Sequence, residues 1–541
     1  HAVRATYFYT AMADLAMLTG DEKYRSAVDQ IWDNAVDRKH YLTGGVGASH
    51  QGEAFSEDFD LRNDGYCESC AGCGMTFWAD RMFRIHHHAH HIDVQERTLY
   101  NNILGAIELS GKNFFYQNPL ASRTPRYSWH ACPCCVGNIP RALLGIKDLM
   151  YAINTERDVL YVNHFVASDG VINEFAGTSL RIRQQTEYPW RGKVRLSLQP
   201  TQPTEFTLKL RVPDRTESDL YRAKPDLRDR FSLRVNGQSM SVPVTAGYVE
   251  LRRRWASGDV VELALPIDVQ RIRCDERVLA NRGRVAIVRG PIVYNIENVD
   301  HDHDVRDLVL PPQSKLNEHW EPDLLGGVVM VEAAAKADEQ TEQSVATTLS
   351  AIPNFVRLNR GDWSQVWITE DPQKVVDSEA NLGLAAKPIV REALDRRTID
   401  RVVVGDRRSE KKHDLKGERT ESGVFRDRRW RDARGGGWFS YELAVNPGTE
   451  SALFCTYWGS DVGNRRFRIM VDDHQIGSQT LDRNNPGEFF DVEYPIPSNF
   501  IGTKRHLVVK LQAEEDAMAG GIFDLRIVRP GDEHESGKSP R

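Results

Sequence analysis

The chain has 541 residues, of which 40% are hydrophobic and 27% are charged, and its formal net charge is −7. A chain of this length has room for about three or four domains, each with its own core. The acidic balance argues against a nucleic-acid-binding protein, which usually presents a basic face. No apolar run approaches the roughly 20 residues of a membrane-spanning helix.

Residues 1–155 follow a helical pattern. Apolar residues recur at helical spacing before and after Thr19-Gly20-Asp21, a sequence that ends one helix and begins the next. The chain opens at His1, within a helical pattern and without an initiating Met, so we expect the native N-terminus to be missing. Helices joined by long loops suggest an α/α toroid of which only the later part is present.

Two motifs in this region give only weak evidence of a binding site. The loop over residues 41–47 is rich in glycine, which favours either a backbone that approaches a ligand or a plain tight turn. The run His86–His91 resembles a metal site, but consecutive helical residues point in all directions. We therefore expect a solvated helix end there.

Six of the eight cysteines fall in two short segments, 67–73 and 132–135, which indicates a site and not a disulfide framework. Glu53 and Glu68 lie close to the first segment. Thiolates together with a glutamate can complete a tetrahedral zinc site. The spacing leaves two interpretations open, a structural zinc site or a metal-held thiolate that acts as a nucleophile beside a carboxylic acid.

Beyond the helices the pattern changes to period two. Successive short strands predict a β-sandwich over residues 156–300 and a second one over residues 431–530. Residues 301–430 mix acidic, alanine-rich and basic pieces, which we interpret as a linker or irregular region. The polar residues 531–541 are expected to form a disordered tail.

An ordered set of motifs in the first 300 residues resembles glycoside hydrolase family 127 and its close relative family 146, the β-L-arabinofuranosidases. The resemblance implies a multidomain α+β fold, in which an (α/α)6 barrel, only its later part present, is followed by β-sandwich domains. The motifs, in the order of the family, are His1-Ala2-Val3-Arg4-Ala5, Thr43-Gly44-Gly45-Val46-Gly47, Gly52-Glu53-Ala54-Phe55, Cys67-Glu68-Ser69-Cys70, Glu96-Arg97-Thr98-Leu99-Tyr100-Asn101, Phe114-Phe115-Tyr116-Gln117-Asn118-Pro119 and Cys132-Pro133-Cys134-Cys135.

The resemblance also implies the chemistry of the site. It implies that zinc is held by Glu68, Cys70, Cys134 and Cys135, that Cys134 is also the nucleophile, and that Glu53 is the general acid/base. A free cysteine is mostly protonated at neutral pH, and a zinc ion removes that proton. The expected reaction is retaining hydrolysis of a plant-type oligo- or polysaccharide through a thioglycosyl-enzyme, which releases β-L-arabinofuranose.

His1, Glu96 and Tyr116 resemble the residues of the family that contact the bound sugar. Taken alone, they are better explained as a helix-end histidine, a solvated glutamate and a packed tyrosine. Cys67 and Cys73 are additional thiols that could compete for the metal or form a disulfide. The chain also departs from the family at Val136-Gly137, where prolines are common.

Two alternatives stay open. The protein could be a non-catalytic carbohydrate-binding or structural protein in which zinc only stabilises the fold, or a glycosidase for another sugar. Because part of the barrel is expected to be missing, we also expect these 541 residues alone to be inactive.

Overall fold

A computed structural model describes residues 1–214, 218–337, 345–375, 394, 397–425, 428–486 and 489–530. The chain divides into two compact units, His1–Val376 and Asp377–Arg541. The predicted disordered tail, residues 531–541, lies outside the described residues.

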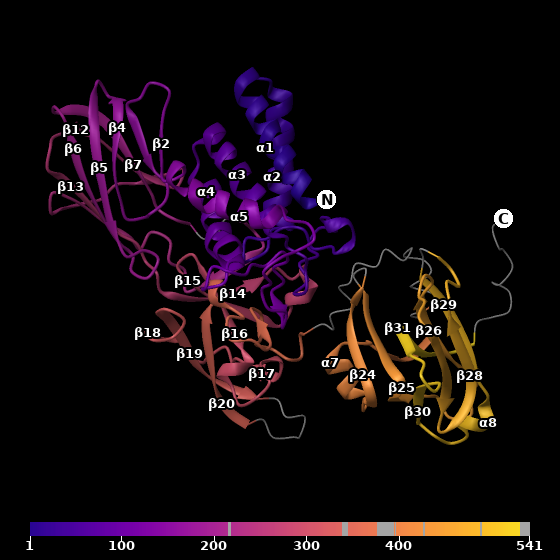
Figure 1. Ribbon diagram of the computed structural model, residues 1–541. Coiled ribbons are helices and arrows are strands. Elements are labelled where there is room, and N and C mark those ends of the chain that lie inside the picture. The colour runs from indigo at the N-terminus through magenta and orange to yellow at the C-terminus, as the bar shows by residue number, and fades with distance from the viewer. Residues whose placement is uncertain are drawn as a thin grey trace. The chain divides into compact units, whose positions relative to one another are not determined.

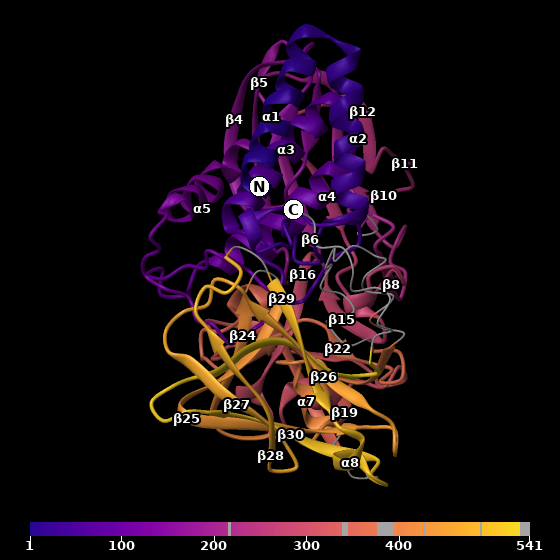
Figure 2. The ribbon, with the colours of Figure 1, turned by 90° about the vertical axis from the view of Figure 1, so that its right-hand side faces the viewer.

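The first unit begins with a group of packed helices, in which α1, α2 and α3 lie side by side (Figures 1 and 2). Gly20 ends α1 in the left-handed conformation, and the Asp21 side chain accepts a hydrogen bond from the first turn of α2, as the sequence predicts. Trp32 and Trp78 pack edge to face at the centre of this core, with ring centroids 4.8 Å apart. The α-helices of the first unit are α1 Ala2–Thr19, α2 Glu22–Arg38, α3 Ser69–His86, α4 Ala89–Thr98 and α5 Cys134–Leu144.

The α+β, multidomain character is confirmed, and most of the described elements are strands. An (α/α)6 barrel has six helical hairpins, whereas the described part of the first unit has the five α-helices above. The closed barrel therefore stays a prediction. No helix among the described residues combines the length and the apolar character needed to cross a membrane.

Two sheets follow and enclose one core; the first is antiparallel, and the second is mixed because β3 and β7 pair in parallel. Their orders are β10-β9-β13-β6-β5-β4 and β11-β12-β7-β3-β2, and buried and exposed residues alternate along β6 as the sequence predicts. The predicted strand near residue 285 belongs to the next sheet, so this sandwich ends earlier than expected. The strands are β2 Tyr151–Ile153, β3 Val159–Val162, β4 Ser168–Phe175, β5 Thr178–Thr186, β6 Lys193–Pro200, β7 Thr204–Arg211, β9 Ser232–Val235, β10 Gln238–Met240, β11 Val244–Thr245, β12 Tyr248–Trp255 and β13 Asp259–Ala264.

An eleven-stranded sheet completes the first unit and includes the strands between residues 308 and 369, so this part of residues 301–430, interpreted as linker or irregular, is regular. Ala333, Ala335 and Ala337 face its core from β19, and alanine is a weak strand former, which hid the period-two pattern. The strands are β1 Ala121–Ser122, β8 Tyr221–Lys224, β14 Val269–Cys274, β15 Arg284–Arg289, β16 Ile292–Glu297, β17 Leu308–Val309, β18 Asn317–Glu321, β19 Val328–Ala337, β20 Val345–Pro353, β21 Ser364–Gln365 and β22 Ile368–Thr369.

The second unit is built on a nine-stranded sheet that encloses a large hydrophobic core. Cys455 lies in that core, and Trp458 packs on Phe489, so both are packing residues. Its elements are β23 Thr398–Val402, α7 Arg407–Lys412, β24 Lys416–Phe425, β25 Arg428–Ala444, β26 Ser451–Trp458, β27 Arg465–Val471, β28 His474–Leu481, β29 Phe489–Ile496, α8 Ser498–Ile501, β30 His506–Ala513 and β31 Ala519–Val528.

Candidate active site

A carboxylate and three thiols converge at the beginnings of two helices. Glu68 is the N-cap of α3 and Cys70 lies in its first turn, while Cys134 and Cys135 are the first residues of α5. One ligand atom from each of the four residues lies within 4.8 Å of all the others. Helix α5 begins at Cys134, which places both thiols beside the start of α3.

The four side chains form a compact donor set. Glu68 Oε1 lies 3.5 Å from Cys134 Sγ and 3.6 Å from Cys135 Sγ. The other carboxylate oxygen, Oε2, is buried without a hydrogen-bond partner. A buried acceptor that lacks a donor is costly, and a bound cation would satisfy it.

The protonation of the thiols reflects their crowding. Burial raises the pKa of Cys134 to about 12, with a further contribution from Cys70. The hydrogen bond between Cys70 and Cys135 lowers the pKa of Cys70 and raises that of Cys135. Without a cation, a thiolate is therefore favoured at Cys70 and disfavoured at Cys134 and Cys135. A bound divalent cation reverses this, because it favours the thiolate at each ligand.

Glu53 is held beside this cluster by two side chains. It ends a short helical turn, Gln51–Glu53, and has a left-handed φ of 51°. His1 Nε2 lies 2.9 Å from Glu53 Oε2, and Tyr66 Oη donates to Glu53 Oε1 over 2.8 Å. Burial raises the pKa of Glu68, and the charge of Glu53 raises it further. The two carboxylates are therefore neighbours.

Tyr116 completes the cluster. Its Oη lies 3.3 Å from Cys134 Sγ. The centroids of the Tyr116 and Tyr66 rings are 6.3 Å apart. Burial, followed by the hydrogen bond with Cys134, raises its pKa, so Tyr116 remains a neutral phenol.

Glu96 lies elsewhere. It is 3% exposed on α4, forms an ion pair with Arg211 of β7, and accepts a hydrogen bond from Tyr188. The structure thus gives Glu96 a role in joining a helix to the sandwich, and its contact with a sugar stays a prediction. All other predicted site residues are linked in the cluster described above.

Comparison with known proteins agrees with the domains seen in the structure. Models of the β-L-arabinofuranosidase catalytic, middle and C-terminal domains of glycoside hydrolase family 127 match residues 1–148, 159–267 and 269–369. The chain belongs to glycoside hydrolase family 127. A domain family of unknown function matches residues 393–528.

Two kinds of relatives support this membership. The family 127 chain is 31% identical over 377 residues to a non-reducing end β-L-arabinofuranosidase of Bifidobacterium longum subsp. longum, a match that covers 65% of this chain and 54% of the relative. It thus spans about half the length of that relative. Solved structures of a GH127 β-arabinofuranosidase and of a GH127 β-L-arabinofuranosidase from Geobacillus stearothermophilus T6 are 36% and 38% identical, with TM-scores of 0.66 and 0.63. Each match covers 69% of this chain and 60% of the other.

Two residues that contact the site, Asn138 and Tyr66, were not predicted from the sequence. Asn138 Nδ2 donates to Cys70 Sγ over 3.1 Å, and its position four residues after Cys134, one helical turn on, could have revealed it. Tyr66 holds Glu53 from a loop, where no periodic signal points to a tyrosine.

Two glycines of the glycine-rich loop pack closely against other parts of the chain. A Cβ at Gly44 would lie 2.4 Å from Thr98 Cα, and one at Gly47 would lie 2.8 Å from the Ala2 side chain. Both glycines have a left-handed φ, so close packing and backbone conformation together explain them.

The histidine run is less solvated than predicted. His91 is buried, Trp32 donates to His90, and His86 pairs with Asp29. Within the described part of the chain, the only group of three or more ligand side chains close enough to share a metal is the Glu68 cluster.

Cys67 and Cys73 are free and fully buried outside the cluster. Burial raises the pKa of each thiol, and neither thiol belongs to the group of side chains close enough to share a metal.

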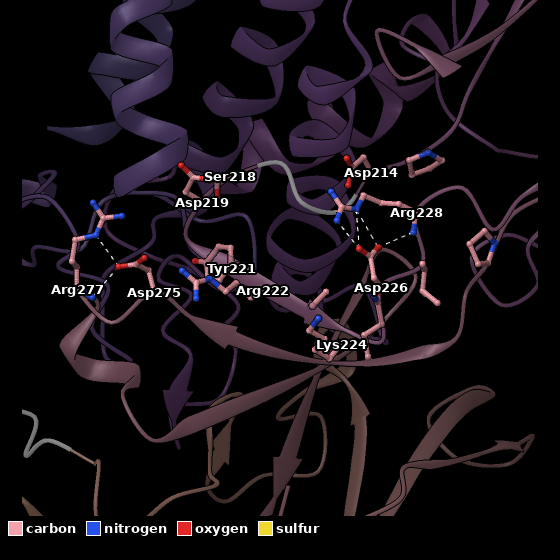
Figure 3. Close-up of a pocket in the computed structure, with 15 residues that line it drawn as sticks. Asp214, Ser218, Asp219, Tyr221, Arg222, Lys224, Asp226, Arg228, Asp275 and Arg277 are labelled. Carbon is pink, nitrogen blue, oxygen red and sulfur yellow. Dashed lines mark hydrogen bonds and ion pairs between the residues drawn. The ribbon is translucent and has the colours of Figure 1, made fainter. Parts of the chain in front are cut away.

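Two cavities among those of the first unit bear on the position of the site. The cavity in Figure 3, of about 650 Å³, carries its own ion pairs, Asp226–Arg228 and Asp275–Arg277, and no predicted site residue lines it. The other, of about 380 Å³, adjoins Tyr116, and we call it the Trp129 pocket. It is lined by Phe115, Gln117, Pro119, Ser122, Thr124, Tyr127, Trp129, His130, Arg357 and Leu358.

Proposed function

We propose that this chain carries the active site of a retaining β-L-arabinofuranosidase that acts on plant-type glycans through a zinc-bound cysteine. One observation carries the proposal: in a family 127 chain, a cysteine of a four-ligand cluster lies beside a carboxylic acid held by two partners. The name of the Bifidobacterium relative supports the choice of sugar.

The ligands proposed for zinc are Glu68, Cys70, Cys134 and Cys135. Three thiols and one carboxylate suit this borderline-soft ion, and the orphaned Glu68 Oε2 is consistent with a missing cation. When bound, zinc would keep the thiols deprotonated at neutral pH.

In the first proposed step, the Cys134 thiolate attacks the anomeric carbon. The bond from that carbon to the leaving oxygen breaks while Glu53 gives its proton to this oxygen, and a thioglycosyl-enzyme results. In the second step Glu53 takes a proton from water, the water oxygen bonds to the anomeric carbon, and the Cys134 thiolate leaves. Two displacements at one carbon retain its configuration.

The neighbours of these residues orient the reaction. His1 and Tyr66 contact different oxygens of Glu53, which fixes the plane of the carboxyl group. Tyr116, neutral and 3.3 Å from Cys134 Sγ, can donate a hydrogen bond to a thiolate or to a sugar oxygen.

The test compares the full-length protein with Cys134→Ala and Glu53→Gln, using zinc analysis and p-nitrophenyl β-L-arabinofuranoside. We expect zinc and dye release in the wild type, and a loss of about 10²-fold or more in each folded variant. Nuclear magnetic resonance of the first-formed sugar should show the β anomer. Cys455→Ala, a buried cysteine of the second unit, is the matched control and should keep full activity.

A non-catalytic role makes a different prediction. If zinc only stabilises the fold, the wild type will hold zinc and cleave no furanoside. If Cys134→Ala retains turnover while folded, the cysteine is not the nucleophile.

A further inference from the structure

We propose that the Trp129 pocket binds the sugar residue on the leaving-group side of the scissile bond. This inference rests on the proposed function and extends it, because it assigns a second sugar-binding position to the same active site. Its volume, about 380 Å³, is within the range of about 300–1,000 Å³ usual for small-molecule sites.

The pocket shares a wall with the nucleophile. The ring of His130, which lines the pocket, stacks on Tyr116 with 4.0 Å between the centroids. The hydroxyl of Tyr116 lies 3.3 Å from Cys134 Sγ. One aromatic ring therefore separates the pocket from the sulfur that would attack the anomeric carbon.

The pocket is also connected to the proposed acid. Gln117, another lining residue, forms a side-chain hydrogen bond with Tyr66, and Tyr66 donates to Glu53. The leaving oxygen must lie within reach of Glu53 while its carbon faces Cys134. The remainder of the leaving group then needs a space close to both residues. The Trp129 pocket lies near both, with Tyr116 between it and Cys134 and Tyr66 between it and Glu53.

The lining suits a neutral sugar. Trp129 is 65% exposed, and the face of an indole ring can cover the C–H face of a sugar. Gln117 and Thr124 offer polar atoms to hydroxyl groups. Arg357 is buried and fixed, with its guanidinium 4.8 Å from the centroid of Phe115, so it presents donors at low entropic cost.

The experiment compares two substrates of the full-length protein. One is a disaccharide in which β-L-arabinofuranose is linked to a second sugar, and the other is methyl β-L-arabinofuranoside, whose leaving group is too small to reach the pocket. We expect Trp129→Ala to lower kcat/KM for the disaccharide by about 10-fold or more, and to leave that for the methyl glycoside within about twofold. Trp320→Ala removes a half-exposed tryptophan of β18 and should affect neither substrate.

A second variant tests the pocket by filling it. Thr124→Trp changes an exposed lining residue, so the fold should tolerate it, and it should also impair the disaccharide selectively. Equal losses on both substrates, or no loss on either, in the two variants would overturn the assignment. If the wild type cleaves neither substrate, the proposed function fails and the subsite fails with it.

Discussion

Substitution of Arg211 tests how helix α4 is joined to the sandwich. Its side chain is fully buried at the end of β7 and lies 2.5 Å from both Asp93 and Glu96 of α4. Arg211→Met keeps most of the volume of the side chain but leaves two buried carboxylates without their cation. Breaking a buried ion pair in this way costs about 3–5 kcal/mol, so we expect the free energy of unfolding of the first unit to fall by that amount.

Urea denaturation of the chain, followed by far-UV circular dichroism, measures this loss, because α1 to α5 lie in the first unit. The matched control is Arg181→Met, which breaks an exposed pair with Asp169 on the same sandwich and should change stability little. A loss for Arg211→Met no larger than that of the control would refute the reasoning.

Urea denaturation, together with a measurement of KM on the full-length protein, separates two roles for Glu96. Since Glu96 is 3% exposed and paired with Arg211, Glu96→Gln should lower stability and leave KM unchanged. A raised KM in a variant of normal stability would instead support the predicted contact with the sugar.

Three further outcomes are expected. A strong chelator should lower the melting temperature of the first unit by several degrees, and Glu68→Gln should reduce that effect, because Glu68 is a proposed ligand. Burial lowers the pKa of His164 to about 3, so below about pH 6.5 the unfolded chain binds a proton that the folded chain does not, and stability falls as the pH falls. Between pH 7 and pH 5 His164 contributes about 2 kcal/mol to this loss, so His164→Gln should reduce the difference between the free energies of unfolding at the two pH values by about that amount, while other buried histidines such as His40 keep their share. Tyr66→Phe removes the hydrogen bond to Glu53 and keeps the ring, so kcat of the full-length protein should fall about 10-fold while zinc content stays normal.

The sequence predicted the elements that have a clear local pattern and missed those that lack one. Gly20 and Asp21 mark a helix end and a helix start through their own backbone and side-chain chemistry, so the sequence suffices there. The alanines of β19 pair with β20, the next strand along the chain, and share a core with side chains of β15 and β16, which no local pattern encodes. In β19, strand pairing outweighed the weak strand propensity of alanine.

The candidate site shows the same division. The ligand cluster was predicted by residues adjacent in sequence and by resemblance to the family, and its geometry is compatible with that prediction. Glu96 shares a motif with the family, but the structure assigns it to an ion pair with Arg211, a residue 115 positions away. Tyr66 joined the site through a loop conformation that only the folded chain shows.

The C-terminal domain of family 127 supports the site from outside the helical region. Two arginines lie against the ring of Phe115: Arg357, which follows β20, at 4.8 Å from the ring centroid, and Arg126 at 4.2 Å. Arg126 also donates to the backbone carbonyls of Arg357 and Gly105. Burial lowers the pKa of Arg126 to about 9 and that of Arg357 to about 10, a cost that these contacts must offset. Because Phe115 directly precedes Tyr116, a residue of the eleven-stranded-sheet region helps to fix the tyrosine beside Cys134, which gives a physical reason for the catalytic and C-terminal domains to share one chain.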